Sequence, residues 1–372
     1  MLKVYGFLAL TTIPLALLAR TDKTVPADRR VDCHPEPNAS KQICESRKCI
    51  WDESMKVPEG VPFCYFPQET GLHFVSHSGR TTNLKKLEDP HSPYGRDYDR
   101  VSMTTEEKGA TLHVVFSSKG SFELPIELQN EPSKSKDSLS VKRLGSSGVF
   151  KFQIVRDSTN TAIWDTSLGG LIFADQFIQI AALLGASKIY GFGENIHQTL
   201  MHNISRYTTW PMFARDEAPY SVKPDTKNLY GVHAFYLGIE KDNKAHGVLF
   251  MNGGAQEVTI GPAPHLIYRA IGGQLDIHFF PGPSPHDVIE QYLALVGRPY
   301  LPAYWGLGFQ LSRWGYKGLD DMKESVEAVR KAKIPLDVPY ADIDYMHRYE
   351  DFTIDEKVCL SFFMTMRKFK TY

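Results

Sequence analysis

Four cysteines form the group of side chains whose type and spacing carry the most specific chemistry. Of the five cysteines in the chain, four lie close together, and the fifth, Cys359, stands far downstream. The four contain no Cys-x-x-Cys pair and have no histidine pair at i, i+4 nearby, which disfavours zinc. We therefore expect no metal and no cofactor, but two disulfide bonds of an exported protein, formed by Cys33, Cys44, Cys49 and Cys64.

Two further features agree with export. Lys3 precedes an apolar stretch from Val4 to Ala19, which we interpret as a signal peptide; a type II membrane anchor is the first alternative and a buried apolar segment the second. Asn38 and Asn203 each begin an Asn-x-Ser triplet and are candidate glycosylation sites. We expect the chain in the secretory pathway, either secreted or anchored at the cell surface.

Charge and composition exclude some classes of partner. The 42 basic and 43 acidic residues give a formal net charge of −1, and no run of like charges would suit a nucleic acid or an anionic membrane. With 372 residues, 42% of them hydrophobic, the chain is long enough for two or three globular domains.

The elements that must position any site begin with a β-rich region from residue 68 to 282. Short apolar and β-branched runs separated by turn residues predict an antiparallel β-sandwich. The triplet Asn-Gly-Gly at 252–254 and the pair Gly-Gly at 272–273 each predict a hairpin turn.

Beyond the sandwich the pattern becomes helical and then alternates. Ser284 and Pro285 predict the start of a helix that ends at Gly297. Three segments follow, predicting a buried strand, an amphipathic helix and a second strand, at 304–314, 320–333 and 336–346. This order is that of the start of a (β/α)₈ barrel.

The block from residue 30 to 67 resembles a P-type trefoil domain, whose mark is a closely spaced cysteine set ending in the motif GVPFCY, here at 60–65. A usual trefoil has six cysteines, bridged one to five, two to four and three to six. The first and fifth are missing here, so the resemblance implies Cys33–Cys49 and Cys44–Cys64. The domain is either a disulfide-linked spacer or a weak contact for glycans or mucins.

The chain from there to about Asp355 resembles glycoside hydrolase family 31, of the intestinal maltase-glucoamylase and sucrase-isomaltase type. The resemblance implies a trefoil, a β-sandwich and a catalytic barrel, and hydrolysis of terminal α-1,4-linked glucose from maltose and starch oligosaccharides. The matching motifs are collinear: YGFGENIHQ at 190–198, TTWPMFARDEAPY at 208–220, NLYGVHAFYL at 228–237, RPYLPAYWGLGFQLSRWGY at 298–316 and YADIDYM at 340–346.

The reacting carboxylates of that family do not occur in this sequence. A retaining glycosidase uses two carboxyl groups about 5 to 5.5 Å apart, and in the family both lie on later barrel strands, the nucleophile in a W-x-D-M-N-E type motif. A full barrel takes about 250 residues, whereas 70 follow Pro302. We expect a catalytically inactive, truncated α-glucosidase with no catalytic residue of its own; the alternative is a secreted, non-catalytic carbohydrate-binding module.

Part of the substrate pocket is expected to remain. By resemblance, Asp342 binds hydroxyls of the non-reducing glucose, with Asp344 on the same side of the strand as a substrate ligand or a partner for a backbone amide. Asp216 reaches over the pocket or caps a turn, and Arg215 orients it. Trp314 and Tyr316 stack on a sugar or pack in the barrel.

The sequence departs from the family at two places. Pro339 stands in the second barrel strand, where it cannot donate a ladder hydrogen bond, and similarity is expected to end after Asp355. The expected segments are a signal peptide or anchor, a linker, the trefoil, the sandwich, the start of the barrel and a divergent tail, at 1–19, 20–29, 30–67, 68–298, 299–355 and 356–372.

Overall fold

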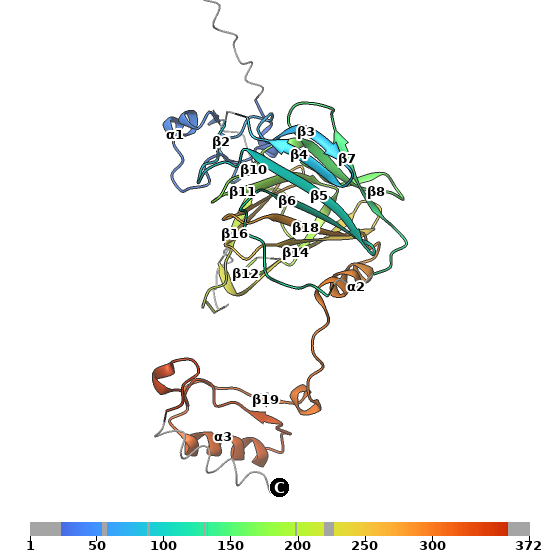
Figure 1. Cartoon of the computed structure of the whole chain (residues 1–372). Helices are drawn as coiled ribbons and strands as arrows, with labels where there is room; N and C mark the ends of the chain where they lie inside the picture. The colour runs from blue at the N-terminus through green and yellow to red at the C-terminus, as the bar shows by residue number, and fades with distance from the viewer. Residues whose placement is uncertain are drawn as a thin grey trace, which may run out of the picture. The chain divides into compact units, whose positions relative to one another are not determined.

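The chain forms two compact units, which divide between Gly297 and Arg298 (Figure 1). The computed structural model describes residues 24–53, 58–87, 90–129, 131, 133–197, 199–218 and 227–355. The expected signal peptide or anchor and the expected divergent tail lie outside these residues. Among the helices described, none combines the length and the apolar character needed to cross a membrane.

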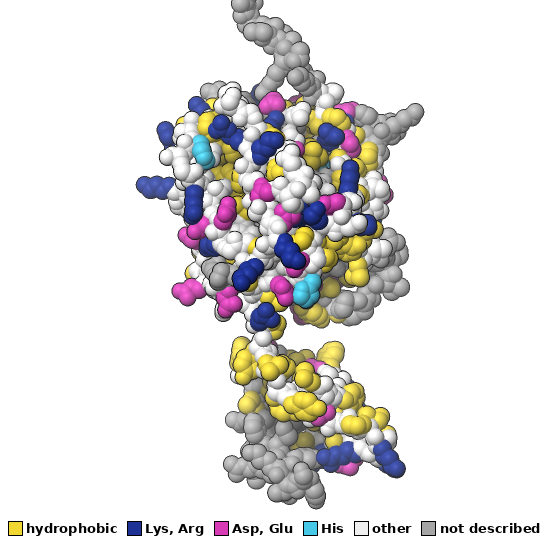
Figure 2. Space-filling view, turned by 90° about the vertical axis from the view of Figure 1, so that its right-hand side faces the viewer, with side chains coloured by type: hydrophobic (Ala, Val, Ile, Leu, Met, Phe, Trp, Pro, Cys, Tyr) yellow, Lys and Arg dark blue, Asp and Glu magenta, His cyan; other side chains and the backbone are white. Residues whose placement is uncertain are grey.

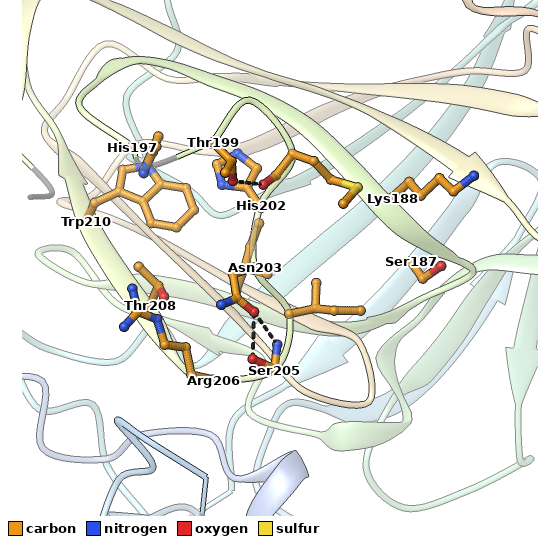
Figure 3. Close-up of a pocket in the computed structure, with 13 residues that line it drawn as sticks. Ser187, Lys188, His197, Thr199, His202, Asn203, Ser205, Arg206, Thr208 and Trp210 are labelled. Carbon is orange, nitrogen blue, oxygen red and sulfur yellow. Dashed lines mark hydrogen bonds between the residues drawn. The ribbon is translucent and has the colours of Figure 1, made fainter. Parts of the chain in front are cut away.

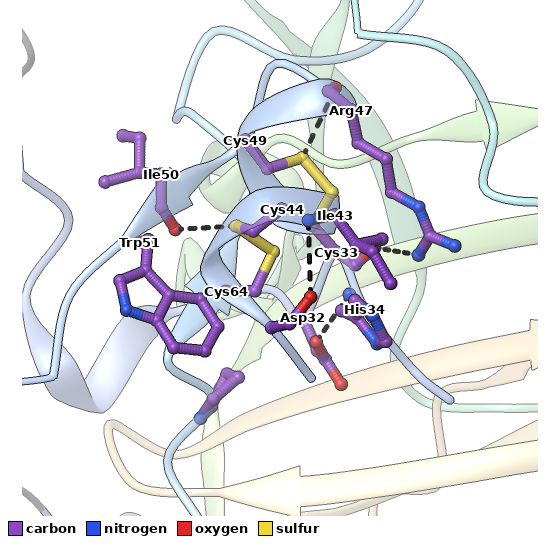
Figure 4. Close-up of a disulfide and its surroundings, with 12 residues drawn as sticks. Asp32, Cys33, His34, Ile43, Cys44, Arg47, Cys49, Ile50, Trp51 and Cys64 are labelled. Atoms are coloured by element: carbon purple, nitrogen blue, oxygen red, sulfur yellow. Dashed lines mark hydrogen bonds between the residues drawn. A yellow bond between two sulfur atoms is a disulfide. The ribbon is translucent and has the colours of Figure 1, made fainter. Parts of the chain in front are cut away.

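The trefoil segment is a small set of short elements held by two disulfides (Figure 4). Its α1 helix begins where the Ser40 hydroxyl accepts a hydrogen bond from the Ile43 amide. The bridges join Cys33 to Cys49 and Cys44 to Cys64, as the resemblance implies. The elements are η1 (Ala27–Arg29), α1 (Lys41–Ser46) and the antiparallel pair β1 (Ile50–Trp51) and β2 (Cys64–Tyr65).

Two antiparallel sheets then form the predicted β-sandwich (Figure 1). In spatial order, the first sheet contains β13 (Thr208–Met212), β16 (Gln256–Gly261), β17 (His265–Ala270), β11 (Ile178–Leu184), β9 (Thr161–Asp165), β8 (Lys151–Arg156) and β7 (Leu139–Leu144), with β10 (Ile172–Phe173) beside β11 and η2 (Thr166–Leu168) after β9. The second contains β12 (Ala186–Asn195), β14 (Asn228–Glu240), β15 (Ala245–Met251), β18 (Leu275–Phe280), β6 (Thr111–Ser117), β5 (Arg100–Lys108), β4 (Thr81–Lys85) and β3 (His73–Ser78).

The core lies between the two sheets because the strands alternate apolar and polar residues. In β6, Leu112, Val114 and Phe116 are all buried and belong to the main core cluster, as the two-residue period of a strand requires. Trp164 of the first sheet has no exposed surface and packs against Phe250 of the second, with 6.0 Å between the ring centroids.

The two glycine-rich turns do not close hairpins, so that prediction is wrong. The turn at 252–254 leads from β15 in one sheet to β16 in the other, and the turn at 272–273 leads from β17 to β18 in the same way. Asn252 joins the two turns, because its side chain donates hydrogen bonds to the carbonyls of Gly272 and Gln274. The positive φ values of Gly272 and Gly273 suit a tight turn of either kind, and therefore do not distinguish a hairpin from a corner between sheets.

A buried arginine joins the two sheets at one end of the sandwich. Arg156, at the end of β8, has no exposed surface. Its Nε and Nη2 donate to Glu240 at the end of β14, at 3.0 and 2.5 Å, and its Nη1 donates to Asp137 at 2.8 Å. The carbonyls of Pro281 and Ala245 accept two further hydrogen bonds. All five N–H groups of the guanidinium are thereby used.

The helix after the sandwich forms as predicted. Helix α2 (Pro285–Val296) begins with a capping box between Ser284 and Asp287 and ends at Gly297, where φ is +96°. Its apolar side packs on the outer face of the second sheet, where Val288 and Leu295 join Phe235, Leu249 and Phe280 in one cluster.

The second unit keeps the predicted strand, helix, strand order, but its strands are much shorter than expected. It contains η3 (Tyr304–Leu307), β19 (Gln310–Leu311), α3 (Leu319–Lys331), β20 (Val338–Pro339) and η4 (His347–Tyr349), with β19 and β20 parallel. The predicted buried strand at 304–314 is wrong: it is mostly not strand, and Tyr304 is 92% exposed. Figure 2 shows many hydrophobic side chains (yellow) on the surface of this unit.

Candidate functional site

The loop after β19 and the turn after β20 come together in the second unit through Asp344. One carboxylate oxygen of Asp344 accepts hydrogen bonds from the amides of Gly315 and Tyr316, at 2.7 and 2.9 Å. This aspartate therefore holds the loop that carries Trp314. Of the two roles considered for Asp344, the structure places it as the partner of backbone amides.

Asp342 lies in the turn at 342–345 and not in a strand, so the expectation that it shares a strand face with Asp344 is wrong. Its backbone is left-handed, with φ of +55°, which aspartate tolerates better than most residues. One oxygen accepts a hydrogen bond from the Ile343 amide at 2.8 Å. The other has no hydrogen-bond partner among the residues that the structure describes, and a half-buried carboxylate of this kind can accept sugar hydroxyls.

The two aromatic candidates of the same loop differ in exposure. Trp314 is 66% exposed and offers a ring face for stacking, whereas Tyr316 is 7% exposed. The guanidinium of Arg313 lies 4.6 Å from the centre of the Tyr316 ring and forms an ion pair with Asp321 at 3.0 Å. Tyr316 is thus placed for packing, and Trp314 is the ring available to a ligand.

Arg215 and Asp216 belong to the other unit, in the exposed loop after β13. The Arg215 amide donates to the carbonyl of Leu229 at 2.7 Å, which ties the loop to β14. Within the described part of the chain, no hydrogen bond or ion pair joins the Arg215 side chain to Asp216.

The trefoil shares a hydrophobic core with the first sheet. Cys33, Cys44, Cys64 and other buried trefoil residues pack with Leu168 and Ile267 of the sandwich in one cluster. Tyr207 joins the two parts further: its hydroxyl accepts a hydrogen bond from the Arg30 amide at 2.9 Å and contacts the Ala27 carbonyl at 3.0 Å. Arg269 of β17 donates to the Asp32 carbonyl at 3.2 Å. The trefoil is therefore built into the sandwich.

A cavity of about 550 Å³, which the sequence pattern did not predict, opens beside β12 and β13 (Figure 3). The rings of His202 and Trp210 stack in parallel, 5.0 Å apart, and His197 meets both rings edge-on. Burial, together with the neighbouring His202, lowers the pKa of His197 to about 4, so the imidazole is neutral at pH 7. The side chain of Asn203, the second glycosylation candidate, lines the same cavity.

One group of side chains on β6 and β18 has the types of a metal site without its geometry. An oxygen of Asp276 lies 2.7 Å from Nε2 of His113 and 3.2 Å from Nε2 of His278. The two imidazole rings are stacked 4.0 Å apart and only 5° from parallel. Because an imidazole lone pair lies in the ring plane, two parallel rings cannot direct theirs at one ion. This group is better described as two histidines sharing a carboxylate.

Two segments of the chain match known protein families. Residues 23–67 match the trefoil (P-type) domain, and residues 299–366 match the glycosyl hydrolases family 31 TIM-barrel domain. The chain contains a trefoil domain and a segment of a family 31 barrel. The barrel match extends to residue 366, beyond Asp355, where we expected similarity to end.

Relatives of known name align with most of the chain. It is 38% identical over 339 residues to human "Probable maltase-glucoamylase 2", covering 88% of the chain. It is 36% identical to "Sucrase-isomaltase, intestinal" of Oryctolagus cuniculus and 34% identical to "Lysosomal alpha-glucosidase" of Mus musculus, over 88% and 91% of the chain. The chain spans only 13%, 18% and 36% of the length of these relatives.

Solved structures support the same fold at lower identity. The catalytic subunit in a crystal structure of an ER glucosidase II complex aligns with 85% of the chain, with a TM-score of 0.60 and 15% identity, and the aligned part is 42% of that chain. A GH31 dextranase of Flavobacterium johnsoniae aligns with 73% of the chain, with a TM-score of 0.55 and 21% identity, over 34% of its own length. At these identities the likeness concerns the fold alone.

Proposed function

We propose that the chain is part of an α-glucosidase that removes terminal α-1,4-linked glucose from maltose and starch oligosaccharides. In this proposal, residues 68–298 form the N-terminal sandwich of the enzyme and residues 299–355 form the start of its catalytic barrel. The alignment of most of the chain with maltase-glucoamylase, sucrase-isomaltase and lysosomal α-glucosidase supports it.

The turn at 342–345 is the observation that carries the proposal. Asp344 uses one oxygen to hold the loop of Trp314, while Asp342 keeps one oxygen without a hydrogen bond to any described residue. A carboxylate and an exposed aromatic ring are groups that suit glucose, because the carboxylate accepts hydroxyl groups and the ring packs on the C–H face of the sugar. We assign glucose binding to Asp342 and Trp314 on this basis.

We further propose that the polypeptide of residues 1–372 does not hydrolyse glycosidic bonds by itself, since it contains no W-x-D-M-N-E type motif. The test is incubation of the purified polypeptide with maltose and with 4-nitrophenyl α-glucoside. We expect no product above that of the buffer alone. Turnover that persists through purification would show that this polypeptide supplies its own reacting carboxylates.

A calorimetric titration with maltose tests the role of Asp342. If the segment binds sugar on its own, Asp342→Ala should weaken binding by about tenfold to a hundredfold, because a hydrogen bond to a charged group contributes about 1.5 to 3 kcal/mol. The exposed Asp351 is the matched control, and Asp351→Ala should leave affinity unchanged. Equal weakening by both substitutions would contradict the assignment; strong binding abolished only by Asp342→Ala would favour the carbohydrate-binding alternative.

We also propose that the protein is a secreted or membrane-anchored glycoprotein, which its two disulfides support. In this proposal the trefoil is structural and does not bind mucin, because much of its apolar surface is used in the shared core with the sandwich. Retention of the chain on immobilised mucin, but not on a matched uncoated resin, would contradict this role.

A further inference from the structure

The glycosylation triplet at Asn203 has a conformation that leaves its reactive nitrogen free. The side-chain oxygen of Asn203 accepts hydrogen bonds from the amide and the hydroxyl of Ser205, at 2.8 and 2.7 Å. The side-chain nitrogen, Nδ2, has no hydrogen-bond partner among the residues that the structure describes. Asn203 is exposed, so Nδ2 can carry a glycan without any change to this turn.

The cavity beside Asn203 has the chemistry of a sugar site. One side of the cavity is lined by the stacked rings of His202, which is 8% exposed, and Trp210, which has no exposed surface. Ile204 and Ile260 add apolar surface, which suits the methyl group of an acetamido sugar. The cavity volume, about 550 Å³, lies in the usual range for small-molecule pockets.

Two buried polar groups of this cavity have no partner. Trp210 has no exposed surface, yet its Nε1 makes no hydrogen bond to any described residue, and the same holds for the buried Nε2 of His197. A buried polar group without a partner costs about 1 to 3 kcal/mol. Because neither nitrogen is exposed, hydroxyl or acetamido groups of a sugar can supply these hydrogen bonds only after a side-chain movement that uncovers them. Among the described residues, the lining includes Lys188 and Arg206 and no carboxylate, and Arg206 forms an ion pair with Glu59 at 3.3 Å.

We propose that this cavity binds the first sugar residue of an N-linked glycan attached to Asn203, so that the glycan is packed as part of the fold. Attachment forms a bond between Nδ2 and C1 of the sugar, breaks the bond from C1 to a lipid-linked pyrophosphate donor, and releases one amide proton. The proposal rests on the proposed passage of the chain through the secretory pathway. Figure 3 shows Asn203 among the residues that line the cavity.

Asn38 supplies a matched control within the same chain. It is also exposed and also begins an Asn-x-Ser triplet. The hydroxyl of its triplet serine, Ser40, instead caps α1, and Asn38 lines none of the cavities described. A glycan on Asn38 should therefore be free in solution.

The test is the rate at which peptide N-glycosidase releases each glycan from the full chain secreted by cultured cells. Site occupancy is measured first by mass spectrometry. If the sugar occupies the cavity nine-tenths of the time, release at Asn203 from the native chain should be about tenfold slower than at Asn38, and denaturation should remove the difference. Ser187→Trp, which fills the cavity from its exposed rim and keeps the triplet, should restore fast release.

The outcomes separate the two proposals. Equal native rates at Asn203 and Asn38, or slow release that Ser187→Trp leaves unchanged, would overturn the packed glycan. An occupied Asn38 with an unmodified Asn203 would also overturn it and leave the secretory proposal intact. A secreted chain that carries no glycan at either residue would refute both the packed glycan and the glycoprotein assignment.

Discussion

Replacing Arg156 with methionine should destabilise the sandwich strongly. The guanidinium is fully buried and neutralises two carboxylates, Glu240 and Asp137, whose side chains are 1% and 3% exposed. Arg156→Met fills most of the space but leaves both carboxylates without their cation. Breaking a buried ion pair from one side costs about 3 to 5 kcal/mol, a large part of the total stability of a domain.

Urea denaturation followed by tryptophan fluorescence measures this loss, because Trp164 and Trp210 are completely buried in the sandwich and should report its unfolding. For a domain of this size the same loss corresponds to a fall in melting temperature of roughly 6 to 20 °C. Arg156→Lys should lie between methionine and wild type, since an ammonium keeps the charge but not the planar fork that contacts Glu240.

An exposed ion pair at the edge of the second sheet supplies the control. Arg80 lies 3.7 Å from Glu106, with side chains 71% and 47% exposed, so Arg80→Met should change stability by less than about 1 kcal/mol. If Arg156→Met costs no more than Arg80→Met, the buried network contributes nothing to holding the two sheets together, and the reasoning is refuted.

Two further predictions concern the join between trefoil and sandwich and the response to acid. Tyr207→Phe should lower the free energy of unfolding by about 1 to 3 kcal/mol, because it leaves the buried Arg30 amide unpaired; an unchanged urea midpoint would contradict this. Burial lowers the pKa of His278. Burial alone would raise the pKa of Asp276, but hydrogen bonding and charge interaction with His113 and His278 together outweigh it and lower that pKa to about 2. Both folded-state pKa values lie below their unfolded values, so their contributions are complete near pH 7 and are lost on acidification, first below about pH 6.5 and then below about pH 4. Urea midpoints should fall accordingly, with a shallower fall between pH 7 and 5.5 for His278→Gln and an unaltered one for the exposed His286→Gln.

The sequence predicted the structural features that depend on neighbouring residues. It did not predict those that depend on residues far apart in the chain. The ends of α2 follow from Ser284 and Gly297, whose effect is confined to one helical turn. The strands of the sandwich follow from alternation, as in β6. The turn at residues 252–254 was predicted to close a hairpin but connects strands of different sheets. The same glycine geometry allows both kinds of turn.

In the candidate site, too, the sequence predicted which residues belong to it but not how the chain arranges them. The motif YADIDYM indicated that Asp342 and Asp344 belong to the candidate site. Their predicted placement on one face required a strand, whereas the chain turns after Pro339. The cavity lined by His197, His202 and Trp210 was missed because it depends on how β12 and β13 fold together. Only the triplet at Asn203, next to His202, pointed to that region.

The shared core of trefoil and sandwich sets an order of events during synthesis. The Asp32 carbonyl and its donor Arg269 are 237 residues apart in sequence, and Ile267 lies in the same hydrophobic cluster as Cys33. At about 5 to 20 residues per second, the ribosome needs roughly 12 to 50 s to make the intervening chain. The trefoil, which emerges before β17, therefore waits with an apolar face uncovered, and early closure of its two disulfides would keep it compact until β17 arrives.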